Sequence, residues 1–367
     1  MRRDRHPALD PAAAIRYGAG MRSYRPMCCA VVLAATLAGG NAAQADERAA
    51  LQASCWAPSA LAATAGERAP VRLQRPAPRA PSVADVSLAA VAMPAGAIRR
   101  VELPPGKKLV ALTFDLCETP GELAGYDGAI VDILRVRGVK ATFFAGGQWM
   151  ASHKARTGQL LSDPLFEVGT HGWAHRNTRL INGGDLKSEM VAPSVTYAAA
   201  WTELSRSQCA AGHAAAFSQI PRQPSLFRFP FGACNAESLR MAADYGLLPI
   251  QWDVSTGDPS PQQSARAIAD ITIRNARPGS IILMHANGRG YHTAEALPAV
   301  IAGLKAKGFE FVSVSELMAA GKPVVTQACY DSRPGDTDRY DFVLHRKPTP
   351  ASNPWSTNVK GAATLPW

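Results

Sequence analysis

Two histidines four residues apart carry the clearest chemical signal in this chain of 367 residues. His171 and His175 lie in the segment Thr170–His175, and at this spacing both imidazoles project from one face of a helical turn. Imidazole nitrogens are frequent ligands of Zn²⁺, so the pair can reach a single ion. Because histidines at this spacing also occur in cores and on surfaces without a metal, the interpretation depends on the segments around them.

Four more short segments place polar side chains in or just after apolar runs. Val110–Asp115 and Ile281–His285 are β-rich runs that end in a carboxylate and an imidazole. Parallel strands are buried along their length, and ligands meet such a sheet at the carboxyl ends of its strands. Phe227–Gly232 contains Arg228, whose guanidinium can orient a carboxylate through a bidentate fork. Trp252–Asp258 supplies a further carboxylate. The aspartate that ends the first run could equally be a helix cap.

In chain order, these five segments resemble the motifs of the polysaccharide deacetylases with the nodulation-type deacetylase domain, carbohydrate esterase family four. The resemblance covers about residues 108–320 and is closest for the histidine pair, for Arg228–Gly232, and for Leu283 with His285. It implies an α/β protein that folds as a distorted (β/α) barrel of the polysaccharide deacetylase type, with its active site at the carboxyl ends of the strands.

The resemblance also implies a role for each matching residue. Asp115 is expected to be the catalytic base, Arg228 to orient it, and the backbone N–H of Phe231 to stabilise an oxyanion. His285 is expected to be the general acid, with Asp258 as its charge partner.

A metal site and a substrate cleft follow from the same resemblance. The expected metal ligands are His171 and His175, and the expected ion is divalent, with zinc first and cobalt or manganese as alternatives. Trp173, Trp252 and Leu283 are expected to line the cleft for an N-acetylated glycan.

The chain departs from the family pattern at the first and fourth motifs. Leu116 stands where the family has an aspartate that is its third protein ligand to the metal. Glu118 is the expected substitute, and Asp115 itself is the alternative. In the fourth motif, Ser255 and Pro259 replace an aspartate and a tryptophan. These changes leave the fold prediction intact, but they bear directly on metal affinity and activity.

The predicted function is therefore an exported, metal-dependent de-N-acetylase of polysaccharides or oligosaccharides. The alternatives are a catalytically weakened glycan-binding protein of the cell envelope and an O-deacetylase. The formal charge of +10 comes partly from arginine-rich ends, and no basic stripe is interleaved with aromatic residues. Nucleic acid is therefore not expected as a partner, and we expect a monomer.

The N-terminus has the pattern of an export signal. Two arginines precede the apolar run Cys28–Leu37, and Ala43–Ala45 is a small-residue cleavage site. Residues 1–45 are thus predicted to be a signal peptide, with translation from Met21 as an alternative start. The run is too short to span a membrane comfortably, so no transmembrane anchor is expected, and the mature protein is placed in the periplasm or outside the cell.

Composition divides the rest of the chain into three parts. Residues 46–100 are rich in Ala and Pro and suggest an extended linker, residues 101–325 form the deacetylase domain, and residues 326–367 suggest a tail over the domain or a disordered end. Strands and helices alternate in between, as in β/α units. The expected strands are 108–114, 141–145, 248–252, 280–284 and 309–312. The expected helices are 127–137, 185–197, 236–245, 261–275, 293–307 and 314–320.

Five cysteines follow the predicted signal peptide. Cys117 and Cys234 each lie two residues beyond a motif, and the family geometry implies that these two loops meet at one site. We therefore expect a disulfide between them, with two reduced, buried thiols as the alternative. One of Cys55, Cys209 and Cys329 should then stay unpaired.

Overall fold

The computed structural model describes residues 46–73, 76–86 and 96–341, so the predicted signal peptide lies outside the described residues. At the centre is a sheet whose strand pairs are all parallel. In spatial order its strands are β8 (Leu248–Pro249), β7 (Leu226–Phe227), β6 (Phe166–Thr170), β5 (Ala141–Ala145), β3 (Leu109–Leu116), β10 (Ile281–His285) and β9 (Val254–Ser255). A short strand, β11 (Glu310–Phe311), pairs with the start of β3.

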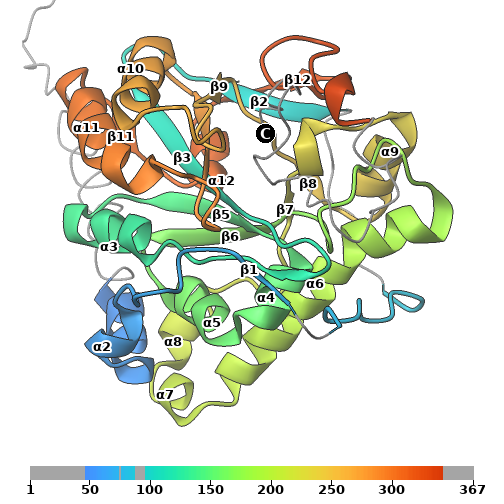
Figure 1. Cartoon of the computed structure of the whole chain (residues 1–367). Helices are drawn as coiled ribbons and strands as arrows, with labels where there is room; N and C mark the ends of the chain where they lie inside the picture. The colour runs from blue at the N-terminus through green and yellow to red at the C-terminus, as the bar shows by residue number, and fades with distance from the viewer. Residues whose placement is uncertain (1–45, 74–75, 87–95, 342–367) are drawn as a thin grey trace, which may run out of the picture. The chain divides into compact units, whose positions relative to one another are not determined.

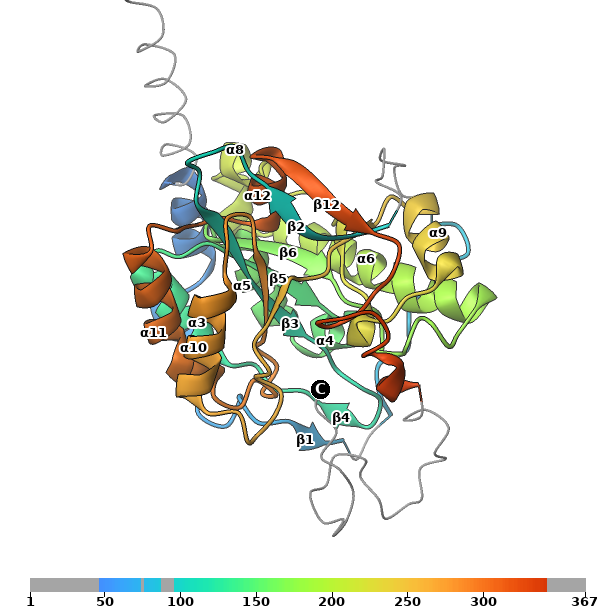
Figure 2. The same cartoon turned by 90° about the horizontal axis from the view of Figure 1, so that it is seen from above.

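An antiparallel ribbon distorts the barrel. It consists of β2 (Ala97–Glu102) and β12 (Lys322–Thr326). Two bridges from β2, Ile98–Ile250 and Arg100–Ser280, join it to residues beside β8 and β10. A second short ribbon pairs β1 (Val71–Arg72) with β4 (Glu122–Leu123). Figure 2 shows α3, α10 and α11 on one side of the strands and α9 on the other. The predicted distorted (β/α) barrel is confirmed.

Helices surround the sheet. Their bounds are α2 (Pro58–Leu61), α3 (Gly128–Arg137), α4 (Gly147–Ser152), α5 (Lys154–Ser162), α6 (Gly183–Ser205), α7 (Gln208–Ala211), α8 (Ala214–Phe217), α9 (Ala236–Asp244), α10 (Ala265–Asn275), α11 (Thr293–Ala306) and α12 (Val314–Ala319), with 3₁₀ turns at η1 (Pro230–Gly232) and η2 (Asp338–Tyr340). No helix in the described part of the chain is long and apolar enough to cross a membrane.

Side-chain alternation divides the core into an inner and an outer layer. On β3, Ala111 faces the barrel interior, where it joins a cluster with Phe144 and Leu283. Leu112 and Phe114 belong to the outer cluster, which packs against the helices. Complete burial of a leucine or phenylalanine side chain contributes about 1.5–3 kcal/mol, so this alternation fixes the register of β3 and with it the direction of the polar groups at its end.

Most predicted elements are present with small shifts at their ends. The strand 141–145 is found as predicted, and Gly138 ends α3 in the left-handed conformation with φ of 59°. The predicted strand 248–252 is wrong beyond Pro249, because the Gln251 N–H turns away to the Ile98 carbonyl of β2 at 2.7 Å. Helices α4 and α5 and the strands of both antiparallel ribbons were not predicted.

The expected extended linker is wrong for its first part. Residues 46–55 are helical, and Leu51 is fully buried. Arg48 donates to the carbonyl of Asp163 at 2.8 Å, and a disulfide joins Cys55 to Cys209 between α6 and α8. Figure 1 shows this segment, in blue, beside α5, α7 and α8. This early segment is thus held by the buried Leu51 together with polar and covalent contacts.

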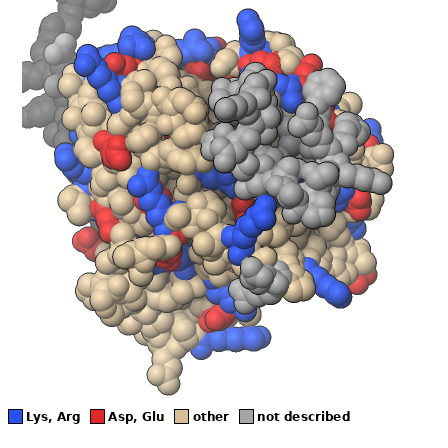
Figure 3. Space-filling model, viewed as in Figure 1, with Lys and Arg blue, Asp and Glu red and all other residues tan. Residues whose placement is uncertain are grey.

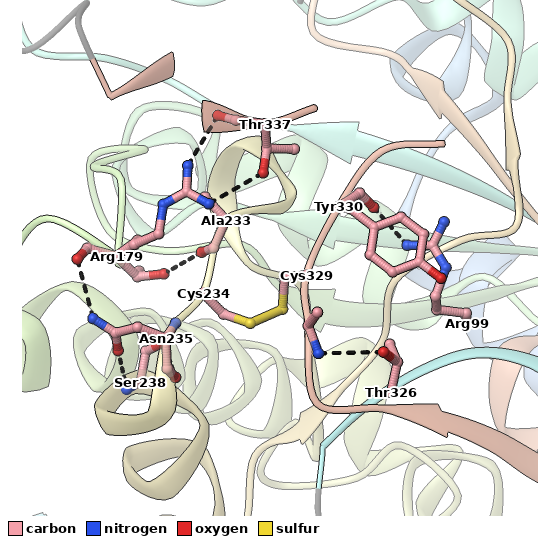
Figure 4. The surroundings of a disulfide bond; sticks show 12 residues. Arg99, Arg179, Ala233, Cys234, Asn235, Ser238, Thr326, Cys329, Tyr330 and Thr337 are labelled. Carbon is pink, nitrogen blue, oxygen red and sulfur yellow. Dashed lines mark hydrogen bonds between the residues drawn. A yellow bond between two sulfur atoms is a disulfide. The ribbon is translucent and has the colours of Figure 1, made fainter. Parts of the chain in front are cut away.

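The described part of the C-terminal tail, residues 327–341, also packs on the domain, and we call it the strap. A disulfide joins its Cys329 to Cys234 (Figure 4). The predicted disulfide between Cys117 and Cys234 is therefore wrong, since Cys117 is a buried free thiol. The expectation of one unpaired cysteine among the other three is wrong for the same reason. Pairing depends on which way the loops face, and Cys234 faces the strap.

Removing the strap disulfide should destabilise the fold. Its two cysteines are 95 residues apart, and a bridge that closes so long a loop stabilises a protein by about 2–5 kcal/mol. We expect the double variant Cys234→Ser/Cys329→Ser to lose stability in this range when oxidised protein is unfolded in guanidinium. Wild-type protein reduced throughout is the reference without bridges. A variant as stable as the oxidised wild type would show that this bridge adds nothing.

Candidate active site

Several strand ends converge on one group of polar side chains. Their parallel pairing brings the carboxyl ends to the same edge of the sheet, and Asp115 of β3 pairs in register with His285 of β10. His171 and Arg228 come directly after β6 and β7, which are neighbours, and Asp258 follows β9 by three residues. The sequence-predicted catalytic residues therefore meet at the edge where ligands bind in such barrels.

A buried ion pair lies at the centre of this group. Arg228 is fully buried, and its Nη1 donates to Asp115 Oδ1 at 2.8 Å. The contact is a single hydrogen bond rather than the expected bidentate fork, because Nε donates to the Ile250 carbonyl. The guanidinium also lies 4.0 Å from the ring centroid of Phe144. Burial favours the neutral carboxyl, but the positive charges nearby outweigh it and lower the pKa of Asp115, so the carboxylate stays ionised.

The two histidines present neutral imidazoles to the same space. His171 Nδ1 lies 2.9 Å from the Arg228 carbonyl, which can only accept, so the proton is on Nδ1 and the lone pair on Nε2. That Nε2 lies 3.4 Å from Asp115 Oδ2. Burial lowers the pKa of both imidazoles, and the neutral form is the one that binds metals. The two rings lie 5.0 Å apart.

A buried glutamate on α6 holds the loop that carries the histidines. Glu189 accepts hydrogen bonds from the backbone N–H groups of Ala174 at 3.1 Å and Arg176 at 2.9 Å. Gly172, with φ of 70°, lies so close that a Cβ there would be 2.5 Å from Glu189 Oε1. His175 itself has a positive φ of 54°, a conformation that persists only where the surroundings enforce it. Sequence reasoning missed Glu189, because nothing local marks a helical glutamate as a partner of a distant loop.

Three side chains in this space suit a metal ion. Cys117, His171 and His175 each offer one ligand atom, and these atoms lie within 4.8 Å of one another. Thiolate and imidazole are typical ligands of zinc, so the donor set fits the expected ion. Burial and the charge of Asp115 raise the pKa of the Cys117 thiol to about 12, so the thiol is protonated at neutral pH unless an ion displaces its proton.

The expected third ligand, Glu118, does not reach this group. Its Oε1 accepts from Ser152 Oγ at 2.7 Å and its Oε2 from the Ala124 N–H at 3.0 Å. Leu116 is fully buried in the outer apolar cluster. In an extended chain, side chains two residues apart share a face, so Cys117 follows Asp115 inward while Leu116 and Glu118 face outward. This alternation is the sequence signal that could have excluded Glu118 and indicated Cys117 instead.

His285 is set up as a proton donor. Its Nδ1 lies 3.0 Å from Asp258 Oδ1, and its backbone N–H donates to Asp258 Oδ2 at 2.7 Å. Thr256 and Thr293 donate their hydroxyl hydrogens to the same carboxylate. Burial alone would lower the pKa of His285, but the fixed negative charge of Asp258 outweighs it and raises the pKa. The predicted partnership thus exists as a hydrogen-bonded pair.

The remaining predicted site residues are Phe231 and the three residues predicted to line the cleft. Phe231 has a positive φ of 60°, and its ring centroid lies 4.3 Å from that of His175. Trp252 is buried below the Arg228 guanidinium at 5.4 Å. Leu283 lies inside the barrel, whereas Trp173 packs in a small cluster with Ala174 and Ala192. Of the three residues predicted to line the cleft, none is more than 7% exposed.

The strap supports the site from outside, which the sequence did not indicate. The ring of Tyr340 lies 5.2 Å from that of Phe231, and Asp331 accepts a hydrogen bond from Trp252 Nε1 at 3.0 Å. Arg179, four residues after His175, donates to the Thr337 carbonyl at 3.0 Å (Figure 4). The strap therefore contacts both the histidine loop and the loop that follows Arg228.

With this geometry, comparison with known proteins is informative. Residues 102–250 match the family model described as polysaccharide deacetylase. Over this segment the chain is similar to the polysaccharide deacetylases. The matched segment contains β3 through β8, and therefore Asp115, both histidines and Arg228.

Individual relatives extend the match to more of the domain. A peptidoglycan-N-acetylglucosamine deacetylase of Listeria monocytogenes is 30% identical over 218 residues, which is 59% of this chain and 40% of that protein. One from Bacillus cereus is 28% identical over 221 residues, 60% of this chain and 71% of the relative. The chain thus spans less than half the length of the Listeria protein. A CE4 family pseudoenzyme from Bacillus anthracis aligns with a TM-score of 0.50 at 25% identity, covering 62% of this chain and 70% of that one.

Glu189 should be needed for metal binding without touching the ion. Residues that hold metal ligands in place typically change metal affinity by about 10–100-fold when replaced, so we expect Glu189→Gln to weaken zinc binding at least about tenfold in a chelator competition titration. Glu167→Gln is the matched control, because Glu167 is also largely buried but accepts from Thr142 at the opposite end of β6. Equal zinc affinity in the two variants would show that Glu189 has no part in the site.

Proposed function

We propose that this protein is a metal-dependent hydrolase that removes acetyl groups from the N-acetylated amino sugars of a glycan. The observation that carries the proposal is the acid–base pair on adjacent strands. Asp115 and His285 pair in register, with the pKa of the carboxyl lowered and that of the imidazole raised. One group is thus ready to accept a proton and the other to donate one, as amide hydrolysis requires.

The relatives indicate the substrate class. The Listeria and Bacillus cereus proteins are named as peptidoglycan-N-acetylglucosamine deacetylases, so an N-acetylated glycan of the cell envelope is the proposed substrate. Such a polymer lies outside the cytoplasm, which agrees with the signal peptide predicted from the sequence. We therefore place the mature protein in the periplasm or outside the cell.

On the face in Figure 3, Lys and Arg side chains are scattered among acidic and uncharged residues rather than gathered in one stripe.

The chain's own groups account for the proton transfers. Asp115, held by Arg228, takes a proton from the attacking water, and His285 gives one to the amine as the C–N bond breaks. The backbone N–H of Phe231 is proposed to stabilise the oxyanion, a contribution of about 2.7–4 kcal/mol per donor in comparable sites. A divalent ion at His171 and His175 would polarise the carbonyl and acidify water. The products are a free amino sugar and acetate.

A glycan-binding protein without turnover is the second candidate. Leu116 in place of a family ligand favours it, as does the similarity to a structure described as a CE4 family pseudoenzyme. The retained set of Asp115, Arg228, Asp258 and His285 favours the enzyme, because sugar binding needs none of that proton chemistry. An O-deacetylase would use the same groups to cleave an acetyl ester instead of an acetyl amide. The two activities are therefore distinguished by whether O-acetylated or N-acetylated sugars release acetate.

Loss of either proton-transfer group should abolish most of the turnover. We expect Asp115→Asn and His285→Ala each to lower kcat for acetate release from N-acetylated peptidoglycan by about 10²–10⁴-fold. The asparagine oxygen can still accept from Arg228, so the fold should survive, which circular dichroism and chemical unfolding would check. Undiminished acetate release from either variant would overturn the assignment. Glycan binding by the wild type without acetate release would favour the second candidate.

The pH dependence of turnover should identify Asp258 as the group that keeps His285 protonated. Asparagine at position 258 removes the negative charge that raises the pKa of His285. The acid then loses its proton at lower pH, so the alkaline limb of the kcat/KM profile should move to lower pH. Asp253→Asn is the control, because Asp253 is a largely buried carboxylate at the other end of β9, where it pairs with Arg277. An unmoved alkaline limb in Asp258→Asn would rule out this role.

A further inference from the structure

Two histidines give a metal ion only two ligands from the chain, whereas catalytic zinc usually has three. The neighbouring carboxylates are less well placed. Asp115 Oδ1 accepts from Arg228, and although its Oδ2 lies 3.4 Å from His171 Nε2, Asp115 is not among the side chains whose ligand atoms lie within 4.8 Å of one another. Both oxygens of Glu118 accept from groups on the outer side of β3. Leu116 has no donor atom, so the residue at the family position of the third ligand cannot bind a metal ion in this chain.

The sulfur of Cys117 is the donor that completes the group. It lies within 4.8 Å of the nearest ligand nitrogens of His171 and His175. Zn–N and Zn–S bonds of about 2.0–2.3 Å in a tetrahedral site place donor atoms roughly 3.3–3.8 Å apart. The three atoms, now within 4.8 Å of one another, therefore need to approach by at most about 1.5 Å to close on an ion. Cys117 takes no part in either disulfide.

The sulfur is also held in place from its far side. Asn287, fully buried just after β10, donates from Nδ2 to the Cys117 carbonyl at 2.8 Å and lies 3.0 Å from Cys117 Sγ. An N–H directed at sulfur stabilises a thiolate, as the groups behind metal ligands commonly do. The cysteine is thus fixed by the backbone and side chain of a different strand end, and its sulfur faces the histidines.

We infer that Cys117 is the third protein ligand and that the metal centre of this chain is a two-histidine, one-thiolate site. This inference rests on the proposed metal-dependent function. On binding, the S–H bond breaks, the proton leaves to solvent and a sulfur–metal bond forms, so the ion gains one negative ligand, as it would from an aspartate. Soft thiolate ligands favour zinc and cobalt over manganese and magnesium, which prefer oxygen. The site should therefore bind zinc and cobalt and discriminate against manganese.

Cobalt substitution tests the ligand directly. Full-length mature protein is stripped with a chelator, loaded with Co²⁺ and examined by absorption spectroscopy. We expect a thiolate-to-cobalt charge-transfer band in the near ultraviolet. The band should disappear in Cys117→Ser, with cobalt affinity at least about tenfold lower. Cys117→Asp should recover part of the affinity without the band.

A matched control removes two other cysteines. Cys55→Ser/Cys209→Ser deletes two cysteines remote from the histidines and should keep the band unchanged. X-ray absorption on zinc-loaded wild type needs no variant. It should show one sulfur at about 2.3 Å beside nitrogen or oxygen at about 2.0–2.1 Å.

Three results would overturn the inference: no sulfur in the zinc coordination shell, a band that persists in Cys117→Ser, or no binding of either metal. The proposed function is tested separately by acetate release. If acetate is released but no sulfur binds the metal, the deacetylase function stands and Cys117 is not a ligand. If the thiolate band is present but no acetate is released, Cys117 is a ligand and the deacetylase function is wrong.

Discussion

The charge of Arg228 is the constraint on which the site depends. Its guanidinium is fully buried, and Asp115 is the one carboxylate it contacts within hydrogen-bonding distance in the described structure. Burying an unpaired charge costs several kcal/mol, so β3 and β7 must stay in the register that brings the two groups together. The same arginine fixes His171 through its own carbonyl. The Asp115 carboxylate and the His171 imidazole are therefore both positioned by one residue, whose guanidinium lies against the aromatic faces of Phe144 and Trp252.

The parts of the molecule that were predictable are those set by local pattern. The apolar runs of β3, β5 and β10 and the glycine that ends α3 were found because alternation and turn chemistry act over a few residues. The disulfide partners could not be predicted in this way, since the pairs Cys55–Cys209 and Cys234–Cys329 depend on how distant segments of the chain pack together. The choice between Glu118 and Cys117 required knowing that β3 stays extended to Leu116, after which alternation alone decides which side chain faces inward.

Two segments outside the parallel strands complete the domain. Arg48 holds the N-terminal helical segment to the last turn of α5, and Cys55 holds it to α7. Cys329 holds the strap to Cys234 in the loop that follows Arg228. The first was expected to be an extended linker because it is rich in Ala and Pro, and the second, rich in Pro and polar residues, to be either a tail over the domain or a disordered end. Their order comes from a few directed contacts rather than from a large apolar surface, so composition alone could not reveal it. Through the strap, residues beyond the family match contribute to the surroundings of His175 and Phe231.

The order of cysteines along the chain has a consequence for biogenesis. Among the five cysteines that follow the predicted signal peptide, the native bridges join the first to the third and the fourth to the fifth, while the second, Cys117, stays reduced. A chain that emerges into an oxidising compartment from its N-terminus presents Cys55 and Cys117 before Cys209 exists as a partner. The earliest bridge it can form is therefore a non-native one that blocks the thiol beside the histidines. Reaching the native state then requires thiol–disulfide exchange, so recovery of correctly paired protein should depend on a disulfide isomerase and not on an oxidant alone.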